Sequence, residues 1–239
     1  MFETLKKQVR VLWSDWLWNL ALLFGGGVIG FVTFQIVLWR NPGMESYLTL
    51  GTIVGGTMAV FFIVIMIMSS IGIYFNVEVS MGCARKHFFG SYFIVSLIEC
   101  LLGMGCLILL CTAENAGNTI LHPGMKNEID FLPYLLKWSV PAAVVLTVFS
   151  LLCGALMIRF GRKAYWILWA IWMAAVLGLP KITDAMSDAP DSVLGRLGNA
   201  VGAAVKAVPG TAWLPCMLAA SAAGLAAAYV LLHRQQVTS

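Results

Sequence analysis

The sequence contains six apolar stretches that are each long enough to cross a lipid bilayer, and polar connections separate them. A helix needs about 20 apolar residues to cross the hydrocarbon core. Only 11% of the 239 residues are charged, whereas globular domains carry about 25%. We therefore expect an all-α, polytopic membrane protein with one membrane domain over residues 1–239. The predicted spans are Leu17–Leu38, Thr49–Gly72, Phe88–Thr112, Ser139–Ile158, Ala164–Leu179 and Ala212–Leu232.

The first 16 residues have an amphipathic pattern. Apolar residues recur at helical spacing from Phe2 to Trp16, and Lys6, Lys7 and Arg10 lie between them. Such a segment is typical of an interfacial helix that lies among the lipid headgroups. The alternative is a frayed basic terminus that only helps to orient the chain. The apolar run continues to Leu38 without an early A-x-A site, so we expect a retained span and not a cleaved leader.

Basic residues gather near one set of span ends. Nine of the 15 lie there: Lys6, Lys7, Arg10, Arg85, Lys86, Arg159, Arg162, Lys163 and Arg234. Short basic connections remain in the cytoplasm. The pattern therefore predicts that both termini, the 73–87 connection and the 159–163 connection are cytoplasmic.

The connection between the second and third spans combines a basic cluster with helical spacing. Val77, Met81, Ala84 and Phe88 are three or four residues apart, and Ser80 can act as an N-cap. This spacing predicts a short cytoplasmic helix. On the simpler interpretation, Arg85 and Lys86 only set the topology and contact lipid headgroups.

The same segment carries a family resemblance. It comprises Phe75, Asn76, Ser80, Met81, Gly82, Arg85, Lys86, Phe88, Phe89 and Gly90. It resembles the loop between spans two and three in the membrane permeases of ATP-binding-cassette type-2 exporters, especially those of Gram-positive bacteria. The six spans, the interfacial helix, the cytoplasmic termini and the long connection before span six also resemble that family.

The resemblance implies that Ser80–Phe89 is a coupling helix that docks into a cleft of a separate ATPase subunit. The implied contact residues are Ser80, Met81, Gly82, Arg85, Lys86, Phe88 and Phe89. The working unit would be two permease chains, identical or homologous, with two ATPase chains, in a bacterial plasma membrane. The sequence has no G-x-x-x-x-G-K-[ST] motif. We therefore expect no cofactor on this chain and no enzymatic activity, with ATP and Mg²⁺ bound by the partner.

Glu99 is predicted near the middle of span three. A carboxylate at that depth costs several kcal/mol unless it is protonated, paired or facing water, so it is a candidate functional residue. It could line a path for substrate or protons, or it could form a structural hydrogen bond to a neighbouring span. The sequence does not identify its partner.

Two outer connections are long. Residues 111–135 are polar and rich in turn residues, which favours a solvated loop. Between Pro180 and Pro209, an apolar periodicity predicts a re-entrant or interfacial helix at about 191–208. By the resemblance, it would cap the exit route through Leu194, Leu197, Val201 and Val205.

The leading hypothesis is therefore the transmembrane subunit of an exporter that moves an amphiphile such as an antimicrobial peptide, a lipid or a drug. The alternative is an ion-coupled secondary transporter centred on Glu99, although such carriers usually have several polar residues or broken helices at mid-membrane depth. The six cysteines and three histidines show no metal-site spacing. We expect no metal, no nucleic-acid partner, and contact with membrane lipid.

Overall fold

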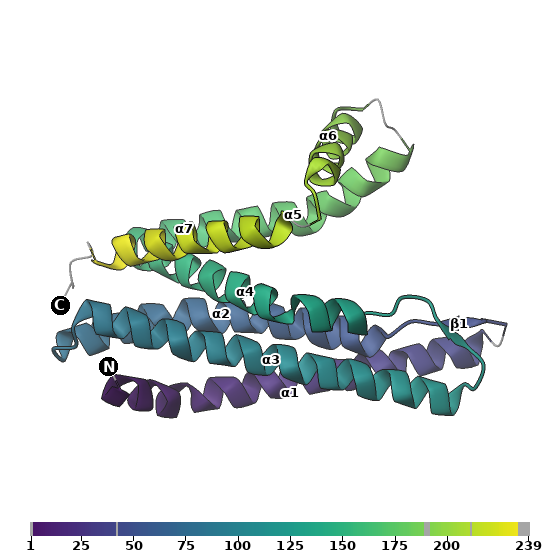
Figure 1. The fold of residues 1–239 in the computed structure, drawn as a ribbon, viewed down its shortest axis with the longest axis horizontal. Helices are drawn as coiled ribbons and strands as arrows, with labels where there is room; N and C mark the ends of the chain where they lie inside the picture. The colour runs from purple at the N-terminus through teal and green to yellow at the C-terminus, as the bar shows by residue number, and fades with distance from the viewer. Residues whose placement is uncertain (1, 42, 189–191, 211, 234–239) are drawn as a thin grey trace.

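The structure is a computed structural model that describes residues 2–41, 43–188, 192–210 and 212–233. It is almost entirely helical (Figure 1). Two-residue strands, β1 (Ser46–Tyr47) and β2 (Lys126–Asn127), pair in parallel and join two connections at one end of the molecule. The helices are α1 (Phe2–Arg40), α2 (Leu50–Ser80), α3 (Arg85–Leu121), α4 (Leu132–Phe160), α5 (Arg162–Asp188), α6 (Val193–Ala207) and α7 (Trp213–His233).

Five helices among the described residues are long and apolar enough to cross a membrane: α1 from Leu5 onward, α2, α3, α4 and α7. They contain five of the six predicted spans. The remaining predicted span, Ala164–Leu179, lies in α5, which does not meet this criterion over its described residues. The chain is therefore an all-α, multi-pass membrane protein, and the count of six spans stays a prediction.

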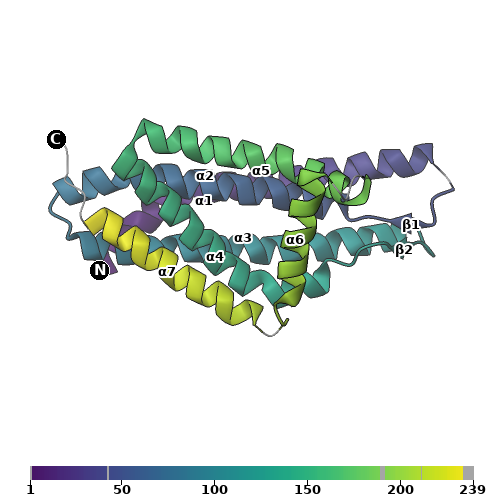
Figure 2. The same ribbon diagram turned by 90° about the horizontal axis from the view of Figure 1, so that it is seen from above.

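Helices α1, α2, α3 and α4 pack as a bundle, and α7 lies along α4 (Figures 1 and 2). Helix α5 returns along the bundle, and its far end pairs with α6, which projects from it (Figure 1). The largest buried cluster lies where α1, α2, α3, α4 and α7 meet, and it includes the fully buried Ile71, Phe75 and Phe88.

Glycines bring α1 and α2 into backbone contact. A Cβ atom on Gly30 would lie 2.6 Å from the carbonyl oxygen of Leu50, and one on Gly26 would lie 3.1 Å from Cα of Gly55. Lipid gives no hydrophobic drive for helix association, so close packing of this kind supplies it. The small-residue spacing on these two helices therefore serves packing within the chain.

The prediction of a separate interfacial helix at residues 1–16 is wrong. Helix α1 runs without a break from Phe2 to Arg40, 39 residues, which is longer than the bilayer core requires. Gln8, Leu12 and Trp16 are buried in the bundle. The amphipathic face of this segment packs on the neighbouring helices, so it does not turn to lie on the headgroups.

The prediction of a short helix at Ser80–Phe89 is also wrong. Helix α2 continues to Ser80 and α3 begins at Arg85, which leaves a turn of residues 81–84. The helical spacing in this segment belongs to the ends of the two long helices. Likewise, residues 111–121 of the predicted solvated loop are helical and complete α3.

Candidate functional site

One end of the bundle gathers exposed cations. The start of α1, the α2–α3 turn, the turn at Gly161 between α4 and α5, and the end of α7 all lie there (Figure 1). We call this the basic end. Its exposed basic side chains are Lys6, Lys7, Arg10, Lys86, Arg159, Arg162 and Lys163.

The α2–α3 turn is held by backbone hydrogen bonds. The N–H of Cys83 donates to the carbonyl of Glu78 (2.9 Å), and the N–H of Gly82 donates to that of Val79 (3.1 Å). Gly82 has a φ of 88°. This pair of bonds with a left-handed glycine is the Schellman motif, which ends a helix sharply and satisfies its last carbonyls. The turn is therefore a defined structure despite its short length.

Arg85 connects the turn to the last helix. Its Nη1 donates to the carbonyl oxygen of His233, the final residue of α7, at 2.6 Å. A cation at a helix C-terminus also interacts favourably with the helix dipole. Phe89 packs edge to face on Tyr229 of α7, with ring centroids 5.4 Å apart. The α2–α3 turn and the end of α7 therefore form one unit.

The predicted ATPase-contact residues divide into two groups. Ser80, Met81, Gly82 and Lys86 are exposed, and Arg85 is half-buried by its bond to α7. Phe88 and Phe89, in contrast, lie inside the core, where Phe88 stacks on Tyr92 and contacts Phe75. A partner docked on this turn would therefore contact the first group, while the phenylalanines fix the turn to the bundle.

Glu99 pairs with Asn19 inside the bundle. The Asn19 amide on α1 donates a hydrogen bond to Glu99 Oε1 on α3, and both side chains are buried. Glu99 lies 14 residues into α3, about 21 Å from the basic end along the helix axis. The partner that the sequence did not reveal is thus an amide from span one, and the Glu99 side chain is buried.

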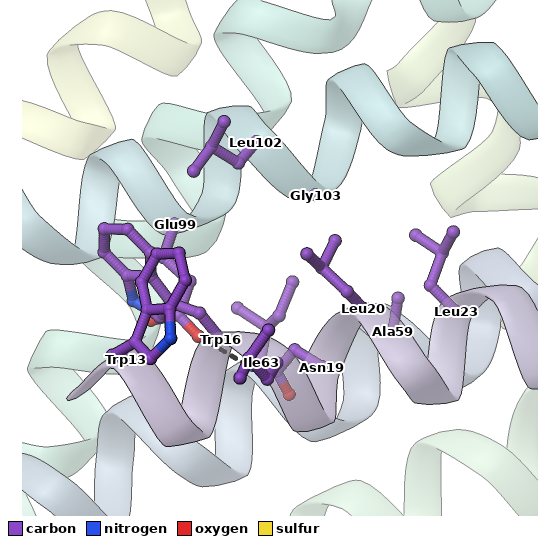
Figure 3. A pocket seen from close by; sticks show the side chains of 11 residues that line it. Trp13, Trp16, Asn19, Leu20, Leu23, Ala59, Ile63, Glu99, Leu102 and Gly103 are labelled. Carbon is purple, nitrogen blue, oxygen red and sulfur yellow. Dashed lines mark hydrogen bonds between the residues drawn. The ribbon is translucent and has the colours of Figure 1, made fainter.

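A pocket of about 110 Å³ lies beside this pair (Figure 3). Residues from α1, α2 and α3 line it, and most are apolar. Figure 3 shows the Trp13 and Trp16 indoles beside Glu99. The lining residues that carry polar groups are Glu99, Asn19 and the two tryptophans, while the accessible surface of the pocket is almost entirely apolar.

A second buried carboxylate, Glu114, has a structural environment. It accepts hydrogen bonds from the N–H groups of Gly51 (2.7 Å) and Thr52 (2.6 Å) and from Thr52 Oγ1 (2.7 Å). These amides belong to the first turn of α2, whose own N-cap residue, Thr49, makes no side-chain capping bond. Glu114 on α3 therefore caps α2, which matches the preference of helix N-termini for negative charge.

The far end of the bundle holds a polar network. Gln35 Nε2 donates to Asn118 Oδ1 (2.8 Å), and Gln35 Oε1 lies 2.7 Å from His122 Nε2. Asn127, on β2, donates to Asn115 at 2.9 Å. These contacts join α1, α3 and the paired connections. Several polar residues of the predicted solvated loop therefore form hydrogen bonds within the chain.

The helix predicted at about 191–208 is present as α6. It packs on α5 through its glycines, because a Cβ atom on Gly198 would lie 2.6 Å from Cγ of Met186. Leu194, Leu197 and Val201 are exposed, and the side chain of Val205 lies outside the described residues. The apolar stripe thus faces away from α5, and a capping role for it remains a prediction.

Sequence reasoning missed Asn19, Trp16 and Glu114. An amide or acid inside an apolar stretch is a usable signal, and Asn19 follows Trp18 at the start of the first predicted span.

No group of three or more potential metal ligands occurs among the described residues. No protein-family model, curated protein or solved structure matches the chain.

Proposed function

We propose that this chain is the membrane subunit of an exporter whose ATP hydrolysis occurs on a separate polypeptide. The resemblance of residues 75–90 to type-2 exporter permeases supports this proposal. A partner would dock on the exposed α2–α3 turn at the basic end, which would face the cytoplasm by the positive-inside rule.

The observation that carries the proposal is the mechanical continuity of this turn. The Schellman bonds hold the turn to the end of α2, the buried Phe88 fixes the start of α3, and Arg85 bonds to the end of α7. A load applied at Met81 and Gly82 would therefore reach three helices. ATP-driven closure of the partner could rock these helices and open the far side of the bundle.

Exposed residues of the turn give the cleanest test. The double change Met81→Asp and Lys86→Glu alters only exposed side chains, so the fold should be retained. We expect this variant to insert normally and to lose most of the stimulation of the partner's ATPase activity. The matched control is Lys126→Glu, an exposed cation in the far connection. Full stimulation in the double variant would contradict the proposal.

Arg85 should behave differently from these residues. Arg85→Ala removes the bond to the carbonyl of His233, so it should weaken the packing of α7 as well as coupling. Charge reversal at Arg85 therefore cannot separate a docking role from a structural one, and the exposed pair is the better choice.

One observation favours the ion-coupled alternative. The carboxylate of Glu99 is buried next to a pocket, and its hydrogen-bond partner is a neutral amide. Transport that needs an ion gradient and proceeds without ATP hydrolysis in reconstituted vesicles would support this alternative and exclude the exporter.

A further inference from the structure

The pocket beside Glu99 has an apolar wall, and a residue that lines it carries a buried polar atom without a hydrogen-bond partner. The Oδ1 atom of Asn19 makes no hydrogen bond with the described residues, and the Asn19 side chain is more than nine-tenths buried. Glu99 accepts a hydrogen bond from Asn19, and the Trp16 indole lies close enough to interact with the same carboxylate. Buried polar atoms without partners are rare and need an explanation, such as an absent ligand.

The ionisable groups at and near the pocket are acidic. The lining residues include the carboxylate of Glu99 and no lysine, arginine or histidine. Asp15, one turn before Asn19 on α1, lies near enough to interact electrostatically with Glu99. A positively charged group would complement this environment, and the faces of Trp13 and Trp16 could add cation–π attraction.

The pocket borders the surface that lipid would cover. Three of its lining side chains are about half exposed: Trp13 (55%), Leu17 (51%) and Leu102 (48%). Leu17 and Leu102 fall within predicted spans, and Trp13 lies shortly before the first of them. A volume of about 110 Å³ exceeds what one water molecule needs, about 10–15 Å³, so the pocket has room for a small head group with the start of an alkyl chain.

From these observations we infer that the pocket between α1, α2 and α3 binds the ammonium head of a cationic amphiphile that enters sideways from the bilayer. Glu99 is the counter-ion, Asn19 holds its carboxylate in place, and the alkyl chain leaves past Leu17 and Leu102 toward lipid. That this ligand is the transported substrate rests on the proposed function, whereas its binding does not.

Binding can be measured on the full-length chain alone, in lipid nanodiscs without any ATPase. A photoactivatable alkylamine serves as the probe, with dodecylamine and dodecanol as competitors of equal chain length. We expect saturable labelling of α1 and α3, with dodecanol competing at least about tenfold more weakly because it cannot form the ion pair. Equal competition by the alcohol would overturn the inference, because it would show a merely apolar site.

Variants test the named residues. Glu99→Gln should weaken dodecylamine binding about tenfold or more, while Glu128→Gln, an exposed carboxylate far from the pocket, should not. Leu102→Trp should obstruct the mouth, and Leu101→Trp, on the adjacent exposed position that does not line the pocket, should have little effect. Unchanged binding in Glu99→Gln and Leu102→Trp would overturn the site. Should Glu99→Gln fail to fold, the head-group comparison in the unaltered chain and Leu102→Trp still decide the question.

The two proposals fail separately. A chain that binds dodecylamine but never stimulates an ATPase would keep the site and remove the exporter. A chain that couples to an ATPase but prefers dodecanol would keep the exporter and remove the cationic ligand.

Discussion

Two buried carboxylates on α3 differ in how their surroundings compensate for burial. Glu114 accepts three hydrogen bonds, two of them from backbone N–H groups at the start of α2. Glu99 accepts one from the Asn19 amide, lies near the Trp16 indole and borders a pocket. A buried carboxylate is tolerated when hydrogen bonds or an opposite charge replace its hydration. Glu114 is therefore a structural residue, while Glu99 has capacity left for a ligand.

The structural role of Glu114 can be tested by Glu114→Gln. The amide keeps the shape of the side chain, removes the negative charge and places an NH₂ group against the N–H donors of Gly51 or Thr52. We expect a loss of about 1–3 kcal/mol in the free energy of unfolding, measured by denaturant titration in detergent. Glu128→Gln, which is exposed, should stay within about 0.5 kcal/mol. Equal effects would mean that Glu114 does not cap α2.

At the scale of the helices, the α1–α2 contact depends on glycine positions that can be compared directly. Gly30→Ala would place a Cβ atom 2.6 Å from the Leu50 carbonyl oxygen, and such overpacking costs about 1–3 kcal/mol. Gly25→Ala lies on the same helix with nothing within 4 Å, so it should gain about 0.5–1 kcal/mol from the higher helix preference of alanine. Thermal unfolding of the two variants in the same detergent gives the comparison, and similar midpoints would rule out the close packing.

The sequence located most of the helices, because long apolar stretches identify spans without reference to neighbours. It misplaced their ends. Gln8 lies in the segment predicted as an interfacial helix, and Glu114 and Asn118 lie in the predicted loop, yet all three are buried against other helices. Their partners come from distant parts of the chain, which one sequence does not reveal. For the same reason Glu99 was identified as a candidate while its partner Asn19 was not.

In the whole molecule, the basic end and the pocket are connected by α3. This helix begins at the α2–α3 turn, carries Glu99 about 21 Å further along, and reaches the cap of α2 at Glu114. Movement of the turn would therefore displace α3 at the pocket and at the far end of the bundle. The projecting α5–α6 pair (Figure 2) lies outside this path, so we assign it no part in coupling.

The central claim, that a separate ATPase docks on the α2–α3 turn, is tested most directly by site-specific photo-crosslinking in cells. A photoreactive residue in place of Met81, whose side chain is 80% exposed, should cross-link to a protein that contains a G-x-x-x-x-G-K-[ST] motif. The same residue in place of Lys126, in the far connection, should give no such product. If the Met81 position captures no ATPase, or the Lys126 position captures one instead, the account is contradicted.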